Sequence, residues 1–178
     1  MANHKAIAAV GRAIVNLLTD ASRKEFTEAE FKLLQTADFA NVERHPKEGA
    51  SVCLYQVEVS SVLRDGALPG LAPGGEVSVS PISLKLKFLI TPWASDPEKQ
   101  YHLLGWIIQV LYDTPILQAT LLNRIAPDEV IFSPDESAKL VFEPISLPDI
   151  SILLQELQQP AVLPSVAYSA SLVLGEAL

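Results

Sequence analysis

The chain has 178 residues, which is enough for one domain around a single hydrophobic core. Apolar residues make up 49% of the sequence and charged residues 19%, so the chain is richer in core-forming residues and poorer in charge than a typical soluble monomer. This composition predicts surface that is hidden against other subunits. The formal net charge of −8 opposes binding to phosphate backbones and anionic lipids, so we expect neither nucleic acid nor a membrane as a partner.

The cysteine content and the N-terminal segment both indicate a protein that folds in the cytoplasm. Cys53 is the single cysteine, which excludes an intramolecular disulfide. The N-terminal segment carries Lys5 and Arg12 within an amphipathic pattern, unlike a secretory signal peptide. The longest uncharged stretch lies between Glu156 and Glu176, but prolines interrupt it, so it does not predict a membrane span.

One predicted helix and one segment without an assigned secondary structure precede the first predicted strand. Apolar residues recur at helical spacing after Asn3, which suits an N-cap, and they predict an amphipathic helix that ends near Asp20. We expect this helix to lie on a sheet. The segment Arg23–Leu34 mixes charged and aromatic residues and fits either a short helix or a loop, so it stays unassigned.

Two long strands with a loop between them are predicted in the middle of the chain. Ser51–Leu63 alternates as a strand does. Arg64–Val79 concentrates glycine and proline, which predicts an exposed loop that orders on assembly. The run ISLKLKFLIT after Pro81 has the cleanest alternation in the chain and predicts a strand that Pro92 ends. The apolar face of the first of these strands is expected to contain Cys53, Tyr55, Val57 and Val59.

The second half of the chain alternates helices with strands. Asp96 and Pro97 suit the N-cap and first position of a helix that runs to Asp113. Its apolar residues cover so much of the circumference that we expect burial on two sides, by the sheet and by a neighbouring subunit. The remaining expected elements are a short helix at Pro115–Leu122, a loop at Arg124–Ser137 with room for a strand at Val130–Phe132, a strand at Lys139–Glu143, a helix at Pro148–Leu157 and a strand at Ser165–Leu174.

These elements predict an α/β fold of the α+β type. We expect a single domain over residues 1–178, with a mixed, mainly antiparallel sheet packed by helices. No internal repeat is visible, and no linker is long enough to divide the chain.

No pattern of residues predicts a catalytic, cofactor or metal site. The stretch PGLAPGGEVS lacks the Gly-Lys-Ser/Thr of a phosphate-binding loop, no Gly-x-Ser-x-Gly occurs, and the three histidines have no metal-ligand spacing. Cys53 paired with His45 or His102 is the one available nucleophile arrangement. An inert buried thiol is the favoured interpretation, and His45 is expected in solvent. We therefore expect no enzyme activity, no cofactor and no metal.

Several blocks, in their order along the chain, resemble one protein family. They are MANHKAIAAVGRAIVNLL, CLYQVEVSSVLRD, ISLKLKFLITPWASDPEKQYHLLGWIIQVLYDTPIL, VIFSPDESAKLVFEPISLPDISILL and SVAYSASLVL. Together they cover nearly the whole chain and resemble the N-terminal domain of the cap or tail-terminator proteins of extracellular contractile injection systems, the antifeeding-prophage and virulence-cassette type of particle. Pro92 is a small departure, because an alanine is expected at that point.

The resemblance implies a subunit similar to phage tail terminators. Such a subunit forms a homohexameric ring that sits on the last layer of tube protein, contacts the last layer of sheath protein and ends their polymerisation. It implies folding in the bacterial cytoplasm before incorporation into the particle. The alternative is an assembly factor or binding module for tube or sheath subunits that does not remain in the particle. A third interpretation, an enzyme of unrecognised type, has no residue to support it.

Five residues are the candidates for contact with partners. They are Arg64, Asp65 and Gly66 in the glycine- and proline-rich loop, and Pro92 and Trp93 at the end of the second strand. Loops carry recognition and exposed aromatic side chains anchor interfaces, which is why these positions are chosen. A core position for Trp93 is an equal alternative.

Overall fold

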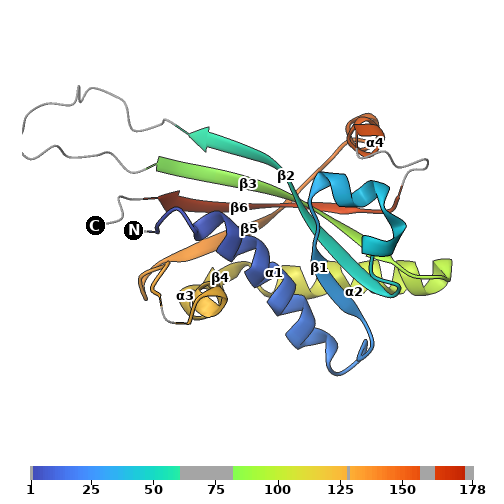
Figure 1. Ribbon diagram of the computed structural model, residues 1–178, viewed down its shortest axis with the longest axis horizontal. Helices are drawn as coiled ribbons and strands as arrows, with labels where there is room; N and C mark the ends of the chain where they lie inside the picture. Colours follow the sequence, from blue (N-terminus) through green and yellow to red (C-terminus); the bar gives the residue numbers. More distant parts are fainter. Residues whose placement is uncertain (1, 61–81, 128, 157–162, 175–178) are drawn as a thin grey trace, which may run out of the picture.

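The computed structural model describes residues 2–60, 82–127, 129–156 and 163–174, and it shows a six-stranded sheet with strand order β1-β2-β3-β6-β5-β4 (Figure 1). β1 is parallel to β2, and the other neighbouring pairs are antiparallel. The predicted α+β class with a mixed, mainly antiparallel sheet is confirmed. The strands are β1 (Glu30–Leu33), β2 (Gly49–Ser60), β3 (Ile82–Trp93), β4 (Ile116–Gln118), β5 (Ser137–Glu143) and β6 (Val166–Leu174). The helices are α1 (Ala6–Ser22), α2 (Pro97–Asp113), α3 (Ala119–Leu122) and α4 (Leu147–Glu156), with short 3-10 helices η1 (Thr36–Ala40), η2 (Val42–Arg44) and η3 (Asn123–Ile125).

The two faces of the sheet are covered differently. On the first, which we call the helix face, Leu86, Phe88 and Ile90 of β3 share the main core with residues of α1, α2 and α3. On the second, which we call the open face, Cys53 and Leu89 pack with residues of η1 and α4. This second cluster lies toward the Trp93 end of β3, which we call the covered end, and Figure 1 shows α4 standing apart from the other helices there. We call the opposite end, at Ile82 and Ser60, the distal end.

α1 forms as predicted, but it begins and ends two residues later. Its N-cap residue is Lys5 instead of Asn3, and its last residue is Ser22 instead of Asp20. Asn3 lies in the turn before the helix, where its Oδ1 accepts a hydrogen bond from the backbone N–H of Lys5 at 2.9 Å. The apolar face that the spacing predicted is buried in the main core.

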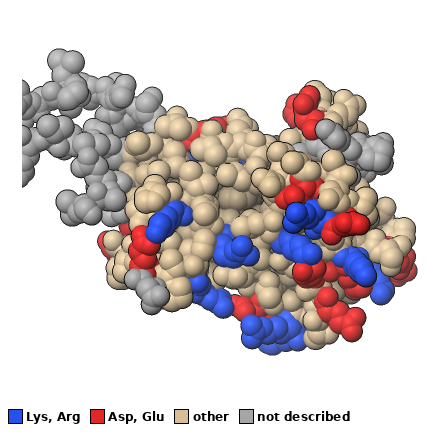
Figure 2. Space-filling view, in the orientation of Figure 1, with Lys and Arg blue, Asp and Glu red and all other residues tan. Residues whose placement is uncertain are grey.

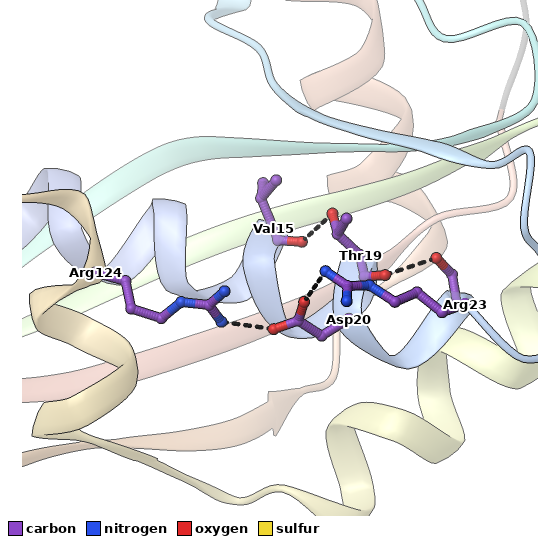
Figure 3. A network of polar contacts seen from close by, with 6 residues as sticks. Val15, Thr19, Asp20, Arg23 and Arg124 are labelled. Atoms are coloured by element: carbon purple, nitrogen blue, oxygen red, sulfur yellow. Dashed lines mark hydrogen bonds and ion pairs between the residues drawn. The ribbon is translucent and has the colours of Figure 1, made fainter.

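Asp20 connects the last turn of α1 to a distant segment (Figure 3). A carboxylate at this end of a helix opposes the helix dipole. Two arginines offset that effect: Arg23 donates to Asp20 Oδ1 at 3.0 Å, and Arg124 of η3 donates to Asp20 Oδ2 at 2.5 Å. These exposed ion pairs contribute at most about 1 kcal/mol each. The pair with Arg124 connects η3 to the last turn of α1.

The unassigned segment Arg23–Leu34 contains strand β1. Its backbone approaches β2 so closely that Gly49, at φ +140°, admits no side chain, because a Cβ atom there would lie 1.9 Å from the carbonyl oxygen of Glu30. β1 has four residues, and only Phe31 among them is buried. So short a strand leaves no periodic signal in the sequence.

The predicted apolar face of β2 is wrong. A bulge at Tyr55 shifts the register of β2 against β3. Cys53 pairs with Leu89 on the open face, whereas Val57 pairs with Leu86 on the helix face. A single extra residue therefore places the two halves of the predicted stripe on opposite sides of the sheet.

Pro92 does not end β3, contrary to prediction. The strand continues to Trp93, and Pro92 pairs with Ala50 of β2. On the other side of β3, the pairing with β6 extends only to Ile90. Proline has no backbone N–H to donate. It is tolerated at this position because, among the described residues, no strand pairs with that side of Pro92.

α2 begins as predicted, since the Asp96 side chain accepts from the backbone N–H of Glu98 at 3.3 Å and Pro97 follows. The expected burial on two sides is not found in the single chain. The buried residues Leu103, Ile107 and Leu111 form one narrow stripe. Beside this stripe, Leu104, Trp106 and Val110 are partly buried against the main core, and Ile108 is exposed.

The predicted short helix at Pro115–Leu122 is wrong in its first half, which forms β4, and correct in its second half, which forms α3. Val130–Phe132 does not form a strand. Instead, Asn123 holds this turn: its Nδ2 donates to the carbonyl of Phe132 at 2.8 Å, and its Oδ1 accepts from the N–H groups of Ile131 and Phe132 at 3.1 and 2.9 Å. Ile131 and Phe132 are buried without ladder pairing, because the Asn123 side chain bonds three of their backbone groups and the N–H of Asn3 donates to the carbonyl of Ile131 at 3.4 Å.

The last three predicted elements are confirmed with small shifts. β5 begins at Ser137, α4 covers Leu147–Glu156 and β6 covers Val166–Leu174. The inward-facing residues of β5 and β6 complete the main core around β3, and those of α4 belong to the second cluster on the open face. In the described part of the chain, no helix is both long enough and apolar enough to cross a membrane.

Candidate assembly surface

The structure places only two of the five predicted contact residues. Arg64, Asp65 and Gly66, with the whole segment Arg64–Val79, lie outside the described residues. Pro92 is buried and Trp93 is half-buried at the covered end.

Trp93 packs within an aromatic group on the open face. Its Nε1 donates to the Oγ of Ser51 at 2.9 Å, and its ring stacks on His45 with centroids 3.9 Å apart. His45, which was expected in solvent, also contacts the carbonyl of Phe39 through Nε2 at 3.0 Å. The indole N–H is thus satisfied inside the subunit, and part of the ring remains at the surface.

Cys53 is a buried thiol, as expected. Burial raises its pKa to about 11, and the nearby negative charge of Asp38 adds to the effect. A thiol with this pKa stays protonated at neutral pH, which removes the thiolate that a nucleophile needs. His102 lies elsewhere, with its Nε2 3.3 Å from Glu25 and its ring against Phe26.

The distal half of the open face carries a row of ion pairs. Lys87 of β3 lies 2.6 Å from Glu58 of β2, and Lys85 lies 2.9 Å from Glu143 of β5. The hydrogen bond to Glu58 raises the pKa of Lys87, and the hydrogen bond from Lys85 lowers the pKa of Glu143. Cross-strand pairs of this kind keep a sheet face polar and ordered without a covering helix.

The helix face is uncovered toward the distal end of β2. Val57 and Val59 have exposed fractions of 42% and 66%, although both point to the side on which α1 packs. Figure 2 shows that the surface above α1, over the distal halves of β2 and β3, is nearly free of charged side chains. On β5, Phe142 is also exposed, with its ring edge against Tyr168.

A hollow of about 450 Å³ opens beside this surface, where β1 ends. Its apolar lining comes from α1, β1, β2 and β3. These residues are Ile7, Ala8, Gly11, Leu33, Leu34, Leu54 and Phe88, with Gln35 and Asp38 at the polar side. The sequence analysis did not predict this surface. The bulge at Tyr55 and the strand β1 shape it, and neither produces a recognisable pattern in the sequence.

The described residues contain no group of three or more His, Cys, Asp or Glu side chains that is arranged to hold a metal ion. The buried side-chain nitrogen and oxygen atoms in this part of the chain all have hydrogen-bond partners. In the described residues, the surface over the distal halves of β2 and β3 therefore consists of apolar side chains on the helix face and ion pairs on the open face.

The fold is that of a class of proteins from contractile injection particles. The chain is similar to the sheath/tube terminator of PVC, an extracellular contractile injection system solved by cryo-electron microscopy in the extended state, with TM-score 0.58 and 17% sequence identity over 95% of this chain. It is equally similar to the tube-terminating cap of the anti-feeding prophage, with TM-score 0.58 and 17% identity over 94% of this chain. The chain spans 57% and 55% of the length of these two proteins.

Residues 9–177 match the Pvc16 N-terminal domain, and the chain belongs to this family. The resemblance that the sequence blocks indicated is confirmed. A comparison with curated proteins found no match.

Proposed function

We propose that this chain is a structural, non-catalytic cap subunit that ends the tube and sheath of a contractile injection particle. It assembles as a homohexameric ring on the last layer of tube protein and contacts the last layer of sheath protein. The observation that carries the proposal is that family membership and the terminator-like fold both extend over nearly the whole chain.

Two physical features support this role. The net charge of −8 fits a ring that does not bind nucleic acid, and the surface above α1, which carries few charged side chains, fits burial against other protein subunits. Cys53 is the residue that the sequence offered as a possible nucleophile, and its thiol is buried and has a raised pKa. A role through shape and hydrogen-bonding edges needs no reactive group.

The test compares particles from cells with and without this protein. We expect the protein in purified particles, and we expect its loss to give tubes of widely varying length in negative-stain electron microscopy. Light scattering of the protein mixed with the tube protein is expected to show a hexamer on the tube end. A monomer that is absent from particles and indifferent to tube protein would favour the assembly-factor alternative.

A further inference from the structure

The outward side of α2 carries an uncharged stripe that the described part of the subunit leaves uncovered. Tyr101, Gly105, Ile108 and Tyr112 follow one another at helical spacing, so they lie on one side of the helix. Tyr101 and Tyr112 are 62% and 78% exposed, and Ile108 is 37% exposed. Large side chains that gather exposed on one side of a helix are typical of a contact surface. We call these four residues the outer stripe.

Gly105 lies in the middle of the outer stripe. A glycine inside a helix is destabilising relative to alanine. Outside its own stretch of helix, no atom of the described residues lies within 4 Å of the position that a Cβ atom would take, so packing inside the subunit does not require this glycine. A position without a side chain allows a second surface to approach the helix backbone closely. Gly105 therefore fits a helix that packs against another molecule on this side.

The hollow where β1 ends is a second and different surface. Its volume is about 450 Å³, and pockets that bind ligands span about 300–1,000 Å³, so it has room for an aromatic ring. Leu33, Leu54 and Phe88 give it apolar walls. Ala8 of α1 also lines the hollow and is exposed, so the hollow is accessible from solvent.

The polar side of the hollow offers a hydrogen-bond acceptor. Asp38 Oδ2 accepts from the backbone N–H of Gln35 at 3.1 Å, and a carboxylate can accept further donors. Among the described residues, no lysine or arginine forms an ion pair with Asp38. An apolar hollow with a carboxylate at one side fits a side chain that has an apolar body and an O–H group at its tip. Tyrosine is that side chain.

The chain itself presents tyrosines of this kind. Of its four tyrosines, Tyr55 and Tyr168 lie within strands and are partly or fully buried, whereas Tyr101 and Tyr112 are exposed on the outer stripe. Tyr112 is the more exposed of the two, and Ile108 lies beside it one turn earlier. Tyr101 lies next to charged residues of the first helical turn. Tyr112 is therefore the better match for an apolar hollow.

Charged residues beside the two surfaces are complementary. Asp113 directly follows Tyr112 and is exposed. Arg12, four residues after Ala8 on the same side of α1, is also exposed. Within the described residues, neither Asp113 nor Arg12 forms an ion pair. Opposite charges at matching places on two surfaces favour their encounter and fix their orientation.

The two surfaces do not meet within one subunit. α2 contributes no residue to the lining of the hollow, and Tyr112 remains 78% exposed. Between two copies they can meet, and because the surfaces differ, each copy keeps one hollow and one outer stripe for further copies. Head-to-tail contacts of this kind generate a closed ring when the rotation between neighbours closes.

We propose that Tyr112 of one copy of this chain inserts into the hollow beside α1 and β1 of the next copy, with its ring against Leu54 and Phe88 and its hydroxyl donating to Asp38. The partner is a second copy because the chain carries both matching surfaces. The ring that this contact builds rests on the proposed function, whereas the contact rests on the geometry and charges above.

The test removes either half of the contact. Tyr112→Ser removes the aromatic ring, and Ala8→Glu places a longer, charged side chain in the hollow. Tyr112→Phe keeps the ring and removes the hydroxyl. Gln109→Ser, on the same helix but outside the outer stripe, and Ala8→Ser, which keeps the hollow open, are the matched controls. All three positions are exposed, and circular dichroism melts check that each variant is folded.

Sedimentation equilibrium measures self-association of each protein, alone and with purified tube protein. We expect Tyr112→Ser and Ala8→Glu to weaken self-association by about tenfold or more, since a buried tyrosine at the centre of a contact carries much of its affinity. We expect Tyr112→Phe to weaken it by about threefold to tenfold through the lost hydrogen bond, and both controls by less than about threefold.

A mixture of the two variants tests the head-to-tail geometry. Tyr112→Ser keeps an intact hollow, and Ala8→Glu keeps an intact Tyr112, so one contact can form between them. Under the conditions in which the wild-type protein associates, we expect each variant alone to remain monomeric. We expect the mixture to form a dimer and no larger species.

Folded Tyr112→Ser and Ala8→Glu proteins that associate as tightly as wild type would overturn the tyrosine contact and leave the proposed function standing. A mixture that stays monomeric would do the same. If Ala8→Glu weakened binding to tube protein but not self-association, the hollow would bind another partner and the contact would again be overturned. Wild-type protein that self-associates neither alone nor with tube protein would overturn both the contact and the proposed ring.

Discussion

The two ends of β3 differ in how many of their faces are buried. At the distal end, burial alternates, with Leu84 and Leu86 inside and Lys85 and Lys87 on the open face. From Phe88 to Pro92 every residue is buried, because α4 and η1 cover the open face there. One strand thus changes from a half-buried to a fully buried pattern, and the sequence marks this point only by the short apolar run Phe88, Leu89 and Ile90.

We expect residues at the covered end to determine the stability of the subunit and residues at the distal end to determine its assembly with partners. The covered end packs both faces of the sheet against the rest of the subunit, so substitutions there should act on folding. Among the described residues, the distal end leaves the apolar side chains of Val57 and Val59 exposed, so we expect substitutions there to act on contacts with partners. The following predictions test this separation, from the largest expected effect to the smallest.

Leu89→Ala and Val59→Ala compare the two ends directly. Leu89 is fully buried in the cluster at the covered end, so its truncation should lower the free energy of unfolding by about 2–5 kcal/mol. Val59 is 66% exposed, and its truncation should change that free energy by less than about 0.5 kcal/mol. Urea unfolding curves measure both. Equal losses would show that the two ends do not differ as described.

Gly49→Ala should destabilise the covered end by about 1–3 kcal/mol or more, because residue 49 has φ +140° and a Cβ atom would collide with the backbone of Glu30. Gly105→Ala in α2 is the matched control. Nothing lies within 4 Å of a Cβ atom there, so we expect a gain of about 0.5–1 kcal/mol from helix propensity. The melting temperatures of the two variants should shift in opposite directions. Shifts in the same direction would contradict the assigned backbone geometry.

Cys53 should make the covered end sensitive to alkaline pH. Its pKa rises from 9.0 to about 11 on folding, so the native state holds the proton that the unfolded state releases between these values. Stability is fully present below pH 9 and is lost as pH rises toward 11, by about 1 kcal/mol at pH 10. Burial also raises the pKa values of Tyr55 and Tyr168, which act in the same direction.

Cys53→Ala should remove the part of this alkaline slope that comes from the thiol and leave the tyrosine part. Urea unfolding at a series of pH values above 8 measures the difference between the two slopes. Identical slopes for the variant and the wild-type protein would contradict a buried, protonated thiol.

Glu143→Gln tests the ion pairs of the open face and should have the smallest effect. The pair with Lys85 is partly exposed, so its loss should cost less than about 1 kcal/mol, and less still at high salt. Pairing lowers the pKa of Glu143 below 4.5, so its contribution is present above that pH and is lost as pH falls. Acid unfolding at two salt concentrations measures the effect. A cost that salt does not change would show that packing, not charge, holds this side chain.

The sequence by itself determined the elements that carry a strong local signal. Helix α2 has the Asp96 cap and Pro97, β3 has a clear alternation, and α1 has a regular apolar stripe. The structure confirms these elements and β6, with β3 extending past Pro92 and α1 shifted by two residues. The family resemblance, which depends on the order of these blocks, is confirmed over residues 9–177. Local signals suffice here because capping, turn chemistry and side-chain periodicity act within a few residues.

Tertiary structure alone decided the features that shape the candidate surface. Strand β1 is ordered by pairing with β2 against Gly49, a contact between distant segments that short sequence windows do not contain. The bulge at Tyr55 reverses which side Val57 faces, and Pro92 stays within a strand because β6 ends before it. Each of these outcomes depends on which strand lies beside a residue, and that neighbour is chosen by packing across the whole sheet.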